Sequence, residues 1–117
     1  MSHTPIRHRL PTNRPGVTRK MEACGFDMYV TVSFFDDGRP GEVFTKIAKA
    51  GSTVSGFMAA LATTISIALQ YGVPWGVLHK KYSAHEFEPH DDKNVSLVGA
   101  LASAVDEAIR NYHDRTV

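Results

Sequence analysis

A long stretch without charged residues constrains the fold of this chain more than any other feature. No Asp, Glu, Lys or Arg occurs between Lys49 and Lys80, and His79 is the only ionisable basic side chain within the stretch. A membrane-spanning helix needs about 20 mostly apolar residues. Polar residues interrupt the apolar run here at positions 55, 63, 64, 66 and 70. We therefore expect a helix of a globular domain and no membrane span.

The apolar residues of this stretch recur at steps of three and four residues, which predicts a helix. We expect Ser52 or Thr53 to cap its start, and Gly72 to follow its C-cap. The opposite face of the helix carries only small side chains, at Ser55, Gly56, Ala59, Ala60, Thr63 and Ser66. A surface helix normally presents charged residues to water. We therefore interpret the small face as an interface.

Two kinds of neighbour could cover this small face. The C-terminal helix of the same domain could pack on it, which would make the face part of the interior. Alternatively, a second copy of the chain or a larger host protein could cover it, and most homo-oligomers formed in this way are two-fold dimers. The sequence leaves both alternatives open.

The segment before this helix has the pattern of a small antiparallel sheet. Strands are expected at Val17–Cys24, Met28–Phe35 and Glu42–Ala48, and their short connections require an antiparallel meander. A short helix is expected to begin at Pro74, and a last helix is expected after a cap at Asn94. The order β-β-β-α-α-α predicts an α+β fold with the helices packed on one face of the sheet.

Length and charge limit the organisation and the class of partner. With 117 residues, the chain is expected to form one domain at 17–117, preceded by a basic, proline-rich arm at 1–16. The formal net charge of +1 argues against nucleic-acid binding, including double-stranded RNA. The prolines of the arm exclude a continuous apolar signal sequence, so we expect a cytoplasmic protein. The arm itself is either a solvated tail or a segment that lies on a partner or a phosphate.

One candidate binding site lies where the charge-free helix begins. Helix N-termini bind anions through free N–H groups and the helix dipole. The candidate nucleotide- or phosphate-binding residues are Arg14, Lys46, Lys49, Gly51, Ser52 and Thr53. The full phosphate-loop pattern of Gly, four residues and Gly-Lys-Ser/Thr is absent. Ordinary helix capping therefore remains the alternative interpretation.

Other arrangements that could carry chemistry are weak. Acidic and histidine side chains crowd one loop, at His85, Glu86, Glu88, His90, Asp91 and Asp92, but without a fixed metal-ligand spacing. We interpret this loop as solvated and expect no metal site. No Gly-x-Ser-x-Gly motif surrounds a serine, and the single cysteine, Cys24, is expected to be a half-buried side chain. No catalytic residue is predicted.

Several sequence segments resemble a known family in the same order along the chain. They are Arg9–Pro15, Asp37–Phe44 with its Gly-Arg-Pro-Gly-Glu run, Ala50–Gly56, Ala68–Pro74 and Phe87–Pro89. This pattern resembles the C-terminal accessory domain of adenosylcobalamin-dependent ribonucleotide reductase, which is named TSCPD after a Thr-Ser-Cys-Pro-Asp signature. The resemblance covers most of the chain, but the cysteine-containing signature after the last helix is absent.

The resemblance implies a place in deoxyribonucleotide synthesis without catalysis by this chain alone. The parent enzyme uses a cysteine pair and a third, radical-bearing cysteine, whereas this chain has one cysteine. Adenosylcobalamin is therefore expected only in a partner reductase, with no cofactor bound directly here. We expect an accessory or regulatory module whose partner is a reductase large chain or a second copy. The alternative is an independent, self-assembling protein that binds or sequesters nucleotides.

Overall fold

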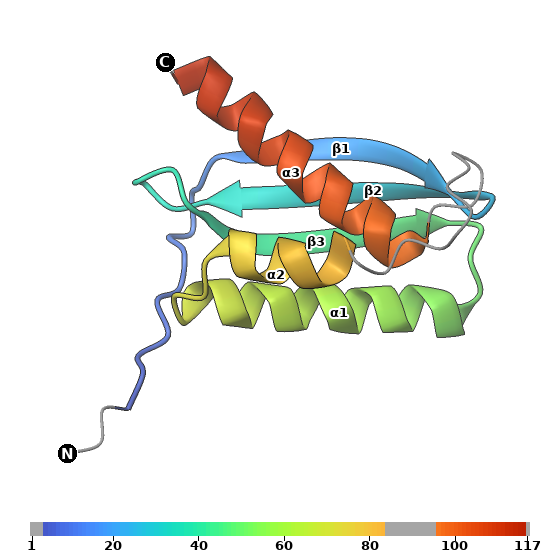
Figure 1. Cartoon of the computed structure of the whole chain (residues 1–117), viewed down its shortest axis with the longest axis horizontal. Helices are drawn as coiled ribbons and strands as arrows, with labels where there is room; N and C mark the ends of the chain where they lie inside the picture. Colours follow the sequence, from blue (N-terminus) through green and yellow to red (C-terminus); the bar gives the residue numbers. More distant parts are fainter. Residues whose placement is uncertain (1–3, 84–95, 117) are drawn as a thin grey trace.

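Three strands precede three helices in the computed structural model of the chain, which describes residues 4–83 and 96–116 (Figure 1). The strands are β1 (Gly16–Ala23), β2 (Phe26–Phe34) and β3 (Pro40–Ala48). They form one sheet in the order β1-β2-β3 with antiparallel pairing throughout. The helices are α1 (Ser52–Gln70), α2 (Trp75–Ser83) and α3 (Leu97–Thr116). The predicted α+β fold and element order are confirmed.

The first hairpin turns one residue earlier than the sequence suggests. Ala23 pairs with Phe26, so Cys24 and Gly25 form a two-residue loop. Both residues have positive φ angles, 53° and 80°, which suit the right-handed twist of the two strands. Cys24 is consequently exposed on the turn, and the expectation of a half-buried side chain at the end of a strand is wrong.

The core lies between the sheet and the helices. Alternate residues of β2, namely Met28, Val30, Val32 and Phe34, are fully buried. In Figure 1, α3 crosses β1 and β2 obliquely, and its Tyr112 ring stacks on Phe34 with 4.1 Å between the ring centroids. Burial of these large side chains is the main stabilising contribution of the fold.

The helix ends correct one prediction and confirm another. The N-cap of α1 is Gly51, without a side-chain capping bond, because Ser52 and Thr53 are themselves the first helical residues. The expectation that either hydroxyl caps the helix is therefore wrong. Gly72 follows the C-cap with a φ of 97°, as predicted. At α3, the Ser96 hydroxyl accepts the Gly99 N–H at 2.9 Å.

The cap predicted at Asn94 lies outside the described residues. It therefore stays a prediction, although Ser96 serves as a cap two residues later.

Helix α1 packs along β3, one of the two edge strands of the sheet (Figure 1). The Val43 N–H donates to the Ser66 hydroxyl at 2.8 Å, and the Gln70 amide donates to the Gly41 carbonyl at 2.9 Å. Four helical residues advance about 6 Å and two strand residues about 6.6 Å. The two bonds therefore match in spacing, and α1 satisfies backbone groups that an edge strand would otherwise leave unpaired.

Candidate functional site

The N-terminal arm packs against the end of α1. Residues 4–15 form neither helix nor strand. The His8 N–H donates to the Gln70 carbonyl at 2.8 Å, and Arg7 Nε donates to Gln70 Oε1 at 2.7 Å. Gln70 is 5% exposed and also bonds to Gly41. One amide side chain thereby joins the arm, α1 and β3.

Gly41 lets the arm approach the sheet closely. A Cβ atom at this position would lie 2.6 Å from a Phe35 ring carbon and 2.9 Å from Leu10 Cδ1. Carbon atoms in contact normally lie about 3.5–4.0 Å apart. A side chain at this position would force the Phe35 ring and Leu10 to move, which accounts for the second glycine of the Gly-Arg-Pro-Gly-Glu run.

A small cleft with three arginines lies on one side of the arm. We call it the arginine cleft; its volume is about 150 Å³, and its lining residues are Arg7, Arg9, Leu10, Arg14, Glu42 and Gln70. Arg14 Nη2 donates to Glu42 Oε1 at 2.8 Å, and Arg14 Nη1 donates to the Pro11 carbonyl at 3.0 Å. Two of the three guanidinium groups are thus held in place by bonds to this chain.

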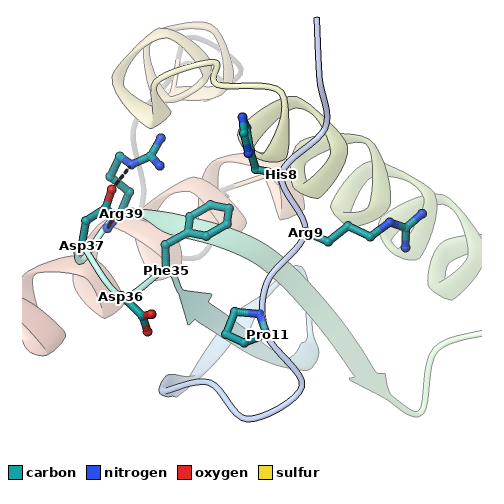
Figure 2. A pocket seen from close by; sticks show the side chains of 7 residues that line it. All are labelled: His8, Arg9, Pro11, Phe35, Asp36, Asp37 and Arg39. Carbon is teal, nitrogen blue, oxygen red and sulfur yellow. Dashed lines mark hydrogen bonds and ion pairs between the residues drawn. The ribbon is translucent and has the colours of Figure 1, made fainter.

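A wider pocket of about 430 Å³ lies on the other side of the arm, beside the turn between β2 and β3 (Figure 2). The Arg39 guanidinium lies over the Phe35 ring, 5.1 Å from its centroid. Asp37 accepts bonds from the backbone N–H and the guanidinium of Arg39, and these bonds lower the pKa of its carboxyl group. Figure 2 shows Arg9 pointing to the side of the arm opposite Asp36 and Asp37.

The outward surface of α1 remains open to solvent. We call it the α1 outer face; it consists of Gly56, Phe57, Ala59, Ala60, Thr63, Thr64, Ile67 and Tyr71, all exposed. Phe57 is 73% exposed, and an added Cβ at Gly56 would meet nothing within 4 Å. Helix α3 packs on β1, β2 and α2. The alternative in which α3 seals the small face is therefore wrong.

Four of the six predicted interface residues, Gly56, Ala59, Ala60 and Thr63, lie on this face, while Ser55 is half-buried. Ser66 is the exception, because it is 7% exposed and its hydroxyl bonds to β3. By length and composition α1 is also apolar enough to cross a membrane, but the core helix of a globular protein passes the same test. However, only 28% of its apolar window is buried. An uncharged, largely exposed surface is therefore the property of α1 that needs a functional explanation.

The residues of the predicted phosphate site do not all come together. Lys46 and Lys49 lie at the end of β3 and in the following turn, near Gly51, Ser52 and Thr53 at the start of α1. Arg14 instead bonds to Glu42 near the start of β3. Its neighbours in the arginine cleft include Gln70, at the far end of a 19-residue helix about 28 Å long. The helix start is thus left with two exposed lysines and two exposed hydroxyl residues.

No metal site is found in the part of the chain that the structure describes, where no three His, Cys, Asp or Glu side chains are placed to hold a metal ion. The acidic, histidine-containing loop at 85–92 lies outside the described residues. Its interpretation as a solvated loop therefore stays a prediction.

Comparison with known families gives a match along most of the chain. The model of the TSCPD domain family matches residues 3–109. The chain belongs to the TSCPD domain family. No solved structure matches it.

The relatives of this TSCPD domain are parts of much larger proteins. A vitamin B12-dependent ribonucleotide reductase of Rhodopirellula baltica is 41% identical over 92% of this chain. Another, from Streptantibioticus cattleyicolor, is 36% identical over 90% of it. The chain spans 10% of the length of the first relative and 18% of the second. The similarity therefore concerns a small domain of each reductase.

Three of the segments that carry the family resemblance meet at the arginine cleft. The arm contributes Arg9 and Arg14, the segment after the β2–β3 turn contributes Glu42, and the end of α1 contributes Gln70. Of these residues, the sequence had indicated only Arg14 as a binding residue. The alternation of Arg7 and Arg9 in an extended arm was the available signal, since such residues point to the same side.

Proposed function

We propose that this TSCPD domain is a non-catalytic accessory or regulatory module of a ribonucleotide reductase, and that it docks on the reductase through the α1 outer face. In this proposal the reductase carries the adenosylcobalamin and the catalytic cysteines. The present chain contributes a folded surface to deoxyribonucleotide synthesis.

The observation that carries the proposal is the absence of charge on an exposed helix. The helix has no acidic residue in its first turn and no basic residue in its last turn. Exposed aromatic and aliphatic side chains, Phe57, Ile67 and Tyr71, lie among small residues on the outer face. Contiguous apolar surface of this kind is typical of protein interfaces. The small residues would let a partner backbone approach closely.

The size of the relatives supports a reductase as the partner. In the two reductases described above, the matching domain is followed or preceded by most of a much longer chain. A face that such a domain turns toward its own enzyme would need no charged residues. A separate chain with the same fold would use that face to bind the enzyme from outside.

Co-purification with a vitamin B12-dependent ribonucleotide reductase tests the proposal. We expect the full chain to bind the reductase and to alter its rate of deoxynucleotide formation. Ala60→Glu should weaken binding at least about tenfold, because it places an unpaired charge inside the interface. Arg110→Gln, which also changes the charge by one unit but lies at an exposed position on α3, should bind as the parent does. Failure to bind, together with no effect on the reductase, would refute the proposal.

The same face would also fit a second copy of this chain, which supports the alternative of an independent, self-assembling module. Sedimentation equilibrium distinguishes the two. A dimer that survives dilution and is disrupted by Ala60→Glu would favour self-assembly, whereas a monomer would favour docking on a reductase.

Nucleotide binding at the start of α1 belongs to this alternative and stays a prediction. Calorimetric titration with nucleoside diphosphates and triphosphates tests it. Lys49→Ala or Ser52→Ala should weaken binding by roughly 1–2 kcal/mol if these residues hold the phosphates. Unchanged binding in both variants would remove the helix start from consideration.

A further inference from the structure

We propose that the arginine cleft is a binding site for a phosphoryl group, separate from the α1 outer face and from the start of α1. The ligand would be inorganic phosphate or the terminal phosphate of a nucleotide. The proposal does not depend on docking to a reductase.

The charge of the cleft favours an anion. Arg7, Arg9 and Arg14 bring three positive charges to a space of about 150 Å³, and Glu42 brings one negative charge. The remaining formal charge of +2 matches a phosphate dianion. The two remaining lining residues, Leu10 and the buried Gln70, are uncharged.

Enough hydrogen-bond donors remain for such a ligand. Each guanidinium has five N–H donors in a planar fork that suits phosphate oxygens. Arg7 uses its Nε–H on Gln70, which leaves both of its terminal NH₂ groups. Arg9 makes no hydrogen bond or ion pair with any other residue that the structure describes. The whole Arg9 guanidinium is thus available to a ligand.

The cleft is built before any ligand arrives. Gln70 fixes the orientation of Arg7, and Glu42 with the Pro11 carbonyl fixes Arg14. Gly41 permits the close approach of Leu10, which brings the arm alongside β3. Preorganised donors bind more tightly because little conformational entropy is lost on binding. A solvated tail with the same arginines would lack this advantage.

The size of the cleft limits what can enter it. A volume of about 150 Å³ accommodates one phosphoryl group and not a whole nucleotide. A nucleotide would therefore insert only its terminal phosphate, with the rest of the molecule outside.

Titration of the full chain with inorganic phosphate, pyrophosphate and ATP, followed by ³¹P NMR and calorimetry, tests the site. We expect saturable binding that weakens with added salt. Arg9→Gln should weaken it about tenfold, since one charge-assisted contact is lost, while Arg9→Lys should retain part of the affinity. Binding of ATP much tighter than phosphate would identify a nucleotide as the source of the phosphoryl group; equal binding would identify free phosphate.

A matched variant locates the site. Arg110→Gln removes one charge at an exposed position on α3 and should bind phosphate as the parent does. Because Arg9 is exposed, Arg9→Gln should leave the unfolding midpoint unchanged, which separates lost binding from lost folding. The proposal is overturned if phosphate does not bind at millimolar concentration, or if Arg110→Gln weakens binding as much as Arg9→Gln.

Discussion

The two long helices, α1 and α3, are similar in length and rich in small residues, yet they use those residues in opposite ways. On α3 the small residues face inward, with Ala100, Ala104 and Ala108 at most 2% exposed. On α1 they face outward, with Ala59 and Ala60 exposed. Alanines on α3 let the helix lie close across the sheet, whereas those on α1 leave a surface on which another protein could lie equally close.

The two helices also differ in how they meet water. The outward side of α3 is charged, and its Glu107 pairs with Arg19 of β1 at 3.0 Å. The outward side of α1 has no charge at all. A small residue therefore does not reveal by itself whether it faces the interior or a partner. The charge on the remaining positions of the helix distinguishes the two cases.

The largest expected difference in stability is between two variants, each of which truncates one apolar residue on one of the two helices. Leu101→Ala removes a side chain that is 1% exposed and should destabilise the fold by about 2–5 kcal/mol. Phe57→Ala removes a larger side chain that is 73% exposed and should change stability by less than about 0.5 kcal/mol. Urea denaturation of both variants measures the difference. Equal destabilisation would mean that the α1 outer face is covered in solution.

A smaller effect is expected within α1, where two hydroxyl groups one turn apart have different neighbours. Ser66→Ala should cost about 1–3 kcal/mol, because the Val43 N–H and carbonyl lose their partner in a buried position. Among the residues that the structure describes, the exposed Thr63 hydroxyl bonds only to the Ala59 carbonyl of its own helix, so Thr63→Ala should be neutral or slightly stabilising. Thermal unfolding compares the pair, and a neutral Ser66→Ala would contradict the role of Ser66 at the β3 edge.

The smallest effect concerns the charged side of α3. Glu107→Gln removes an ion pair whose side chains are 40% and 36% exposed, and should cost about 0.2–1 kcal/mol. The cost should shrink in 1 M salt because exposed charges are screened. Denaturation at low and high salt measures it. Because Gln keeps the size and shape of Glu, a cost that is independent of salt would show that the hydrogen bond to Arg19, rather than the charge of Glu107, contributes the stability.

The sequence predicts most of the fold because its signals are local. Strand and helix periods place the described elements to within two residues, and Gly72 marks the end of α1 correctly. The α1 start is missed because Gly51 and the two following hydroxyl residues give competing capping signals. The sequence assigns Ser66 to the small outer face of the helix, which is wrong. The border of a helical face depends on what packs beside it, and here Ser66 contacts the edge of β3.

The arginine cleft could not be assembled from the sequence. Its lining comes from the arm, β3 and the end of α1. These segments are far apart in the sequence: the bond between Arg7 and Gln70 joins residues 63 positions apart. The path of the arm over Gly41 decides this arrangement, and no periodicity encodes that path. The α1 outer face could be predicted better, because the absence of charge is a property of the sequence itself.

The bonds from Ser66 and Gln70 to β3 have a consequence for how the sheet could be extended. Because the helix occupies the margin of that strand, an incoming strand would have to displace α1 before it could pair there. Any β-augmentation of this three-stranded sheet would therefore take place beside β1, on the side remote from α1. A strand added there and a partner bound to the α1 outer face need not compete.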